Sequence, residues 1–110
     1  MHDEPRPFFA RRLSSDDHVV LELGGECDAS TLDELEVLRE VISEQPHEVI
    51  VDLAQATFVD SLTLGSLTAA AKRVRASGGS FRVVRAAAPE VRRAFEITGL
   101  DKYLLVSTQT

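Results

Sequence analysis

The chain has 110 residues, enough for one domain, and its 44% hydrophobic and 27% charged residues are typical of a globular protein. A formal charge of −6 argues against direct, nonspecific binding of nucleic acid, which needs a basic surface. One cysteine and three scattered histidines exclude an internal disulfide and predict neither a metal site nor a cofactor. No apolar run is long enough for membrane insertion, so we expect a cytoplasmic protein.

Apolar periodicity predicts five strands and three helices. Alternating or β-branched runs predict strands, and apolar residues spaced by three and four predict helices. In chain order these are strands over 8–14 and 18–23, a helix over 30–43, a strand over 48–53, a helix over 61–76, a strand over 80–85, a helix from 89 closed at 99, and a short strand over 103–106. Residues 1–7 form a predicted tail, and 54–60 a connecting loop.

Glycine and serine residues indicate where some of these elements begin and end. Gly24 and Gly25 are expected to end or bend the second strand. Ser30 is the expected N-cap of the first helix, and a serine also stands at the predicted N-cap of the second, Ser61. Because helices alternate with strands, we expect an α/β fold with right-handed crossovers. The prediction is one domain over 8–107, with a mixed sheet of four to five strands and three or more helices mainly on one face.

Three segments carry a resemblance to a known family. GECDAST at 25–31 follows a predicted strand, FVDSLTLGSL at 58–67 opens the second helix, and a third segment runs from Pro89 through Phe95 to Lys102. In this order and spacing they resemble the STAS family, whose members include bacterial anti-sigma factor antagonists, also called anti-anti-sigma factors. Three ordered matches are more specific than any one of them.

The resemblance implies a partner-switching regulator of transcription rather than an enzyme. In such antagonists the serine after the aspartate is phosphorylated by a partner that is both anti-sigma factor and serine kinase, and that position here is Ser61. The unphosphorylated antagonist binds this partner, which releases its sigma factor; phosphorylation weakens the complex, and a phosphatase acting on phosphoserine restores it. Leu62 and Thr63 depart from the family pattern, which has a small hydroxyl residue and then glycine there.

The predicted site has three kinds of member. Ser61 is the phosphorylation site, and Asp60 and Asp28 are expected to flank its hydroxyl and to repel an added phosphate. The remaining candidates are residues of the two motifs that could contact the partner: Glu26, Ser30, Thr31, Leu62, Thr63, Gly65 and Ser66.

Other interpretations remain open at this level. Taken alone, Ser61 is a helix cap, and Asp28 and Asp60 are turn or cap residues. Within the same fold, a STAS domain can also be an unphosphorylated adaptor subunit of a lipid-transport or stressosome-type complex. An enzyme is disfavoured because no motif links Ser61 to a histidine and the chain has no phosphate-binding glycine-rich loop.

Overall fold

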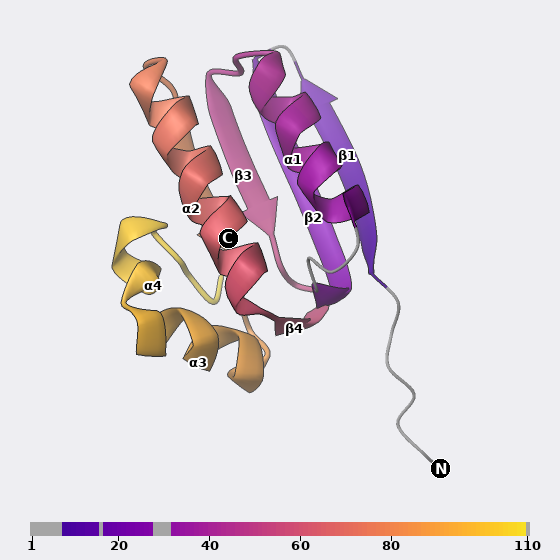
Figure 1. Ribbon diagram of the computed structural model, residues 1–110, viewed down its shortest axis with the longest axis vertical. Coiled ribbons are helices and arrows are strands. Elements are labelled where there is room, and N and C mark those ends of the chain that lie inside the picture. The colour runs from indigo at the N-terminus through magenta and orange to yellow at the C-terminus, as the bar shows by residue number, and fades with distance from the viewer. Residues whose placement is uncertain (1–7, 16, 28–31, 110) are drawn as a thin grey trace.

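Five strands form one mixed sheet in the computed structural model, which describes residues 8–15, 17–27 and 32–109 (Figure 1). The strands are β1 (Phe9–Ser15), β2 (His18–Cys27), β3 (Glu48–Asp52), β4 (Ala56–Val59) and β5 (Ser80–Val84). The order is β1-β2-β3-β5, with β4 pairing the last residues of β2. Only β1 is antiparallel to its neighbour, so the carboxyl ends of β2, β3, β4 and β5 point the same way.

One face of the sheet is buried and the other is partly open. Along β2, Val19, Leu21 and Leu23 are buried, whereas Val20 and Glu22 between them are half-buried. Since successive side chains of a strand point to opposite faces, this alternation assigns the buried row to one side of the sheet. β3 alternates in step with β2, so this strand too has one buried face and one half-buried face.

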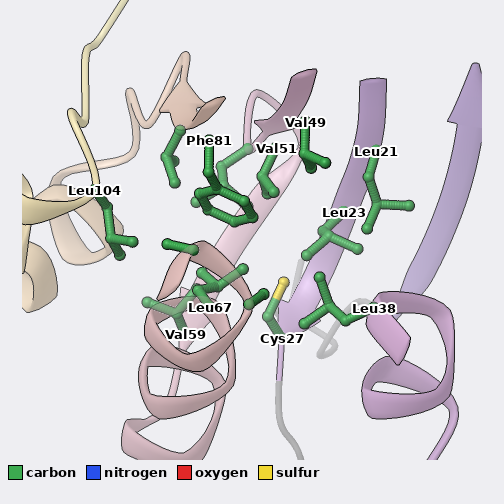
Figure 2. Close-up of a cluster of buried hydrophobic side chains, with 14 of the residues drawn as sticks. Leu21, Leu23, Cys27, Leu38, Val49, Val51, Val59, Leu67, Phe81 and Leu104 are labelled. Atoms are coloured by element: carbon green, nitrogen blue, oxygen red, sulfur yellow. The ribbon is translucent and has the colours of Figure 1, made fainter. Parts of the chain in front are cut away.

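Helices α1 (Leu32–Ser43) and α2 (Ser61–Ala76) lie side by side over the buried face (Figure 1). Because these two helices cover the same face, the expected placement of the helices mainly on one face is confirmed. Two further helices, α3 (Pro89–Thr98) and the short α4 (Leu100–Tyr103), follow in the chain. The core between the layers is aliphatic with two phenylalanines. Figure 2 shows its middle, to which strands, helices and the segment after α4 contribute Leu21, Leu23, Val51, Phe81, Leu38, Leu67 and Leu104.

The segment predicted as a loop over 54–60 contains a strand, β4, so that prediction is wrong. Ala56 and Val59 are buried, and β4 pairs in parallel with residues 25–27. This pairing also explains why Gly24 and Gly25 do not end β2. The strand bends there, with Gly25 at φ 70° and a register shift between Gly25 and Glu26, and then continues to Cys27.

The predicted strand over 103–106 is also wrong. Gly99 is left-handed at φ 74°, ends α3 and leads directly into α4, which includes Tyr103. Beyond it, Leu104 is buried and its carbonyl accepts a hydrogen bond from Val83 N at 3.1 Å. Leu105 has φ 53°, outside the extended region, so the segment touches the edge of β5 without forming a regular strand.

Candidate functional site

The N-terminus of α2 begins where β2 and β4 end together. Cys27 and Val59 are paired in register, and Asp60 follows Val59 directly. Asp60 is the N-cap: its backbone is extended (φ −95°, ψ 175°) and its Oδ1 accepts a hydrogen bond from Thr63 N at 2.8 Å. Ser61 is therefore the first helical residue and not the N-cap, because the aspartate one position earlier already caps the helix.

Thr63 ties this helix start to the sheet. Its side chain is fully buried, and its Oγ1 donates a hydrogen bond to the carbonyl oxygen of Cys27 at 2.7 Å. The same carbonyl accepts from Asp60 N at 3.2 Å. Since a buried hydroxyl needs such an acceptor, Thr63 is a structural strut, and its prediction as a partner contact is wrong.

Ser61 and Leu62 face outward from the first turn. Ser61 is exposed, and the side chain of Leu62 is 64% exposed, which is high for a leucine. Their backbone N–H groups belong to the first turn and have no acceptor within the helix, and neither is bonded to another residue that the structure describes. The exposed turn thus presents a hydroxyl and two N–H donors at the positive end of a 16-residue helix.

The other predicted contacts are placed unevenly. Gly65 is exposed, with open space where a side chain would stand, whereas Ser66 is half-buried and its Oγ donates to the carbonyl of Leu62 at 2.9 Å. Glu26 is half-buried and pairs in register with Phe58 of β4. The structure therefore gathers these residues around the end of β2 and the start of α2. Three further predicted site residues lie outside the described part of the chain: Asp28, Ser30 and Thr31.

Phe58 is a surface residue that sequence reasoning missed. Its ring is 42% exposed, although it belongs to a strand whose two ends are buried. The burial pattern of β4 does not alternate, because Ala56 and Val59 are both buried while the two residues between them are exposed, so no periodic signal in the sequence marks Phe58 as a surface residue. Phe58 and Leu62 are thus two large exposed apolar side chains close in sequence to Ser61, as at the centre of many protein interfaces.

Nothing near Ser61 in the described structure resembles a catalytic centre. His18 and His47 lie at the amino ends of β2 and β3, whereas Ser61 follows the carboxyl ends of β2 and β4. Within the described ranges, no three metal-ligating side chains come together, and no helix has the length and apolar character needed to cross a membrane. Among the described residues, the Ser61 hydroxyl therefore has no histidine beside it that could act as its base.

Comparison with known proteins agrees with this arrangement. The family model described as "Mlab, STAS domain" matches residues 11–107. An anti-sigma-B factor antagonist of Staphylococcus epidermidis is 31% identical over 99 residues, which cover 89% of this chain and 91% of that protein. The name of that relative describes an antagonist of an anti-sigma factor.

Solved structures show the same fold. An anti-sigma factor antagonist from Mycobacterium paratuberculosis superposes with a TM-score of 0.82 at 26% identity, covering 92% of this chain and 86% of that one. The Bacillus cell fate determinant SpoIIAA in its phosphorylated form superposes with a TM-score of 0.67 at 20% identity, covering 91% and 90%. The chain therefore belongs to the STAS domain family and is a homologue of anti-sigma factor antagonists.

Proposed function

We propose that this protein is an anti-sigma factor antagonist whose binding to an anti-sigma factor serine kinase is switched off by phosphorylation of Ser61. One observation carries the proposal: Ser61 is an exposed hydroxyl in the first turn of a helix whose start is fixed to the sheet. The unphosphorylated protein occupies the kinase, which then releases its sigma factor. The names of the relatives support the antagonist role, and the phosphorylated form of SpoIIAA supports the modification.

The geometry accommodates a phosphate without unfolding. The N–H groups of Ser61 and Leu62 can donate to phosphate oxygens, and the positive end of the helix dipole favours the added charge. The phosphate brings about −1.5 to −2 charges next to Asp60. Since the cap and the Thr63 strut stay in place, phosphorylation changes what the surface binds and leaves the fold intact.

The partner surface in this proposal is centred on exposed apolar side chains. Phe58 and Leu62 would be buried by the kinase, with Gly65 allowing close approach of its backbone. The motif residues Glu26, Asp28, Ser30 and Thr31 remain proposed contacts at the neighbouring chain segment. A phosphatase acting on phosphoserine would restore binding, and the cycle would run in the cytoplasm, where kinase and ATP are present.

The test is phosphorylation by the kinase-type anti-sigma protein that co-purifies with the chain from its native cell. With ATP, wild-type protein should gain one phosphate that maps to Ser61, and Ser61→Ala should gain none. Ser77→Ala is the matched control and should be phosphorylated like the wild type, because Ser77 lies at the opposite end of α2 from Ser61. Equal phosphorylation of Ser61→Ala would refute the assignment.

A second function is favoured by Leu62. An apolar side chain that is 64% exposed beside Ser61 could anchor a permanent complex that needs no phosphate. In that case the protein would be an unphosphorylated adaptor subunit of a lipid-transport or stressosome-type complex. Co-purification separates the two functions, since a membrane ATPase as the stable partner supports the adaptor and a kinase-like anti-sigma protein supports the antagonist.

A further inference from the structure

The seam between α1 and α2 is hollowed on its outer side. Two adjoining hollows of about 190 and 250 Å³ share Arg39 and Ile42 of α1 and Arg73 of α2. Leu38 and Ala69, together with Ile42, form the apolar floor of the smaller hollow. We call this surface the α1–α2 groove, defined by Leu38, Arg39, Ile42, Ser66, Ala69 and Arg73.

The rim of the groove is positively charged. Arg39 and Arg73 are exposed, and neither is within ion-pair distance of a carboxylate that the structure describes. By contrast Glu44, near the end of α1, is paired with Arg12 of β1, on the side of α1 away from α2. A chain of net charge −6 thus places over one apolar groove two guanidinium groups that pair with none of the described carboxylates.

The groove is continuous with the surface around Ser61. Leu62, Ser66, Ala69 and Arg73 follow one another at spacings of four, three and four, which places them on one face of α2. At about 1.5 Å per residue, the stripe runs roughly 16 Å from Leu62 to Arg73. An occupant of the groove would therefore reach the switch serine with its far end.

We propose that the α1–α2 groove docks an acidic, amphipathic helix of the partner protein. Its apolar side chains would fill the floor at Leu38, Ile42 and Ala69, and its carboxylates would pair with Arg39 and Arg73, whose planar guanidinium groups suit carboxylates. A helix fits better than a strand, because the groove lies between two helices and offers no open sheet edge.

This inference rests on the proposed function in one respect: the helix belongs to the protein whose binding Ser61 controls. A phosphate on Ser61 would then lie at one end of the stripe that holds an acidic segment, and repulsion would promote release. The inference thus assigns a partner chemistry, acidic and apolar, to a surface that includes neither Ser61 nor the Thr63 strut.

The test measures binding of a synthetic probe to the full-length, unphosphorylated, ¹⁵N-labelled protein. The probe is a capped 18-residue helical peptide with leucines on one face and glutamates beside them, and the control peptide carries lysines in place of the glutamates. The glutamate peptide should produce saturable NMR shifts at Leu38, Ile42, Ser66 and Ala69, and the lysine peptide should not. Arg39→Glu with Arg73→Glu should weaken binding more than tenfold.

The matched control is Lys72→Glu with Arg93→Glu, which makes the same charge change at exposed positions outside the groove and should alter binding less than twofold. Absence of saturable binding by the glutamate peptide, equal binding of the lysine peptide, or equal effects of both double variants would overturn the proposal. Shifts at Arg39 and Arg73 with inorganic phosphate, without peptide binding, would instead assign the arginines to a phosphate ligand. The peptide experiment contains no kinase, so its outcome does not depend on phosphorylation of Ser61. If the peptide binds but the kinase assay leaves Ser61 unmodified, only the proposed function is contradicted.

Discussion

Thr63 and Cys27 are 36 positions apart in sequence, yet the hydroxyl of one donates to the backbone carbonyl of the other at 2.7 Å. This bond joins the first turn of α2 to the last residue of β2, the two places where the motif segments meet. Thr63 has a larger side chain than the glycine of the family pattern, and this side chain is therefore buried inside the protein. It sets the position of Ser61 relative to the sheet without contacting a partner.

Thr63→Val should destabilise the protein by about 1–2 kcal/mol, because it removes a buried hydrogen bond while keeping the side-chain shape. The measurement is urea unfolding followed by circular dichroism. Thr57→Val, on the exposed face of β4, is the control and should change the free energy of unfolding by less than about 0.5 kcal/mol. Equal stability of the two variants would show that the bond to Cys27 contributes nothing.

Asp60→Ala should lower the free energy of unfolding by about 1 kcal/mol, since the N–H of Thr63 loses its cap. For a domain of this size, that corresponds to a fall of roughly 4–8 °C in Tm. Asp60→Asn keeps a capping oxygen and should lose much less. If both variants melt together, the carboxylate charge and not the cap stabilises the helix start.

Gly24 and Phe9 predict a non-additive pair of substitutions. The two residues are opposite each other in register, and a Cβ on Gly24 would stand 2.0 Å from Cε1 of the Phe9 ring. Gly24→Ala should therefore displace the ring, which is 43% exposed and free to swing outward, at a cost of about 1 kcal/mol. In a Phe9→Ala background the same substitution should cost less, and additive effects in a double-mutant cycle would contradict this packing.

Much of this fold follows from local patterns. The spacing of Leu64, Leu67 and Val74 was enough to place α2, and Pro89 with Gly99 was enough to bound α3. β4 escaped prediction because a four-residue strand is defined by its pairing with Gly25–Cys27, about 30 positions away, and not by its own periodicity. The helix that includes Tyr103 was not predicted, because the burial of Leu104 is compatible both with the predicted strand and with the observed helix.

The site was predictable in part for related reasons. Ser61 and Leu62 could be placed at a helix start, but the predicted N-cap, Ser61, is wrong by one position, because two adjacent residues have good capping side chains and the geometry selects Asp60. The inward direction of Thr63 depends on the end of β2, which no local pattern shows. The α1–α2 groove likewise exists only once Arg39 and Arg73 are brought together by packing of two helices.

Acid should weaken the contact between β1 and α1. The Arg12 guanidinium donates hydrogen bonds to the Glu44 carboxylate and holds the pKa of Glu44 below its ordinary value of 4.5. A carboxyl whose pKa is lowered by folding contributes stability above about 4.5, and that contribution is lost as the pH falls further. Urea midpoints from pH 6 to pH 3 should therefore fall less steeply for Glu44→Gln than for the wild type. Because the pair is exposed, 0.5 M salt should reduce the difference, and parallel curves at low salt would contradict the assignment.

Phosphorylation of Ser61 should leave the secondary structure intact while changing binding. The modification moves the net charge from −6 to about −8 at a helix end that can hold the phosphate, so the far-ultraviolet circular dichroism of the phosphoprotein should match that of the unmodified protein. Ser61→Asp should bind the partner kinase weakly and Ser61→Ala should bind it well, since only the former places a charge beside Asp60. Tight binding of both variants would show that a negative charge at position 61 does not release the partner. A large loss of helical signal on phosphorylation would mean that the phosphate unfolds the start of α2, and release would then follow from disorder and not from repulsion.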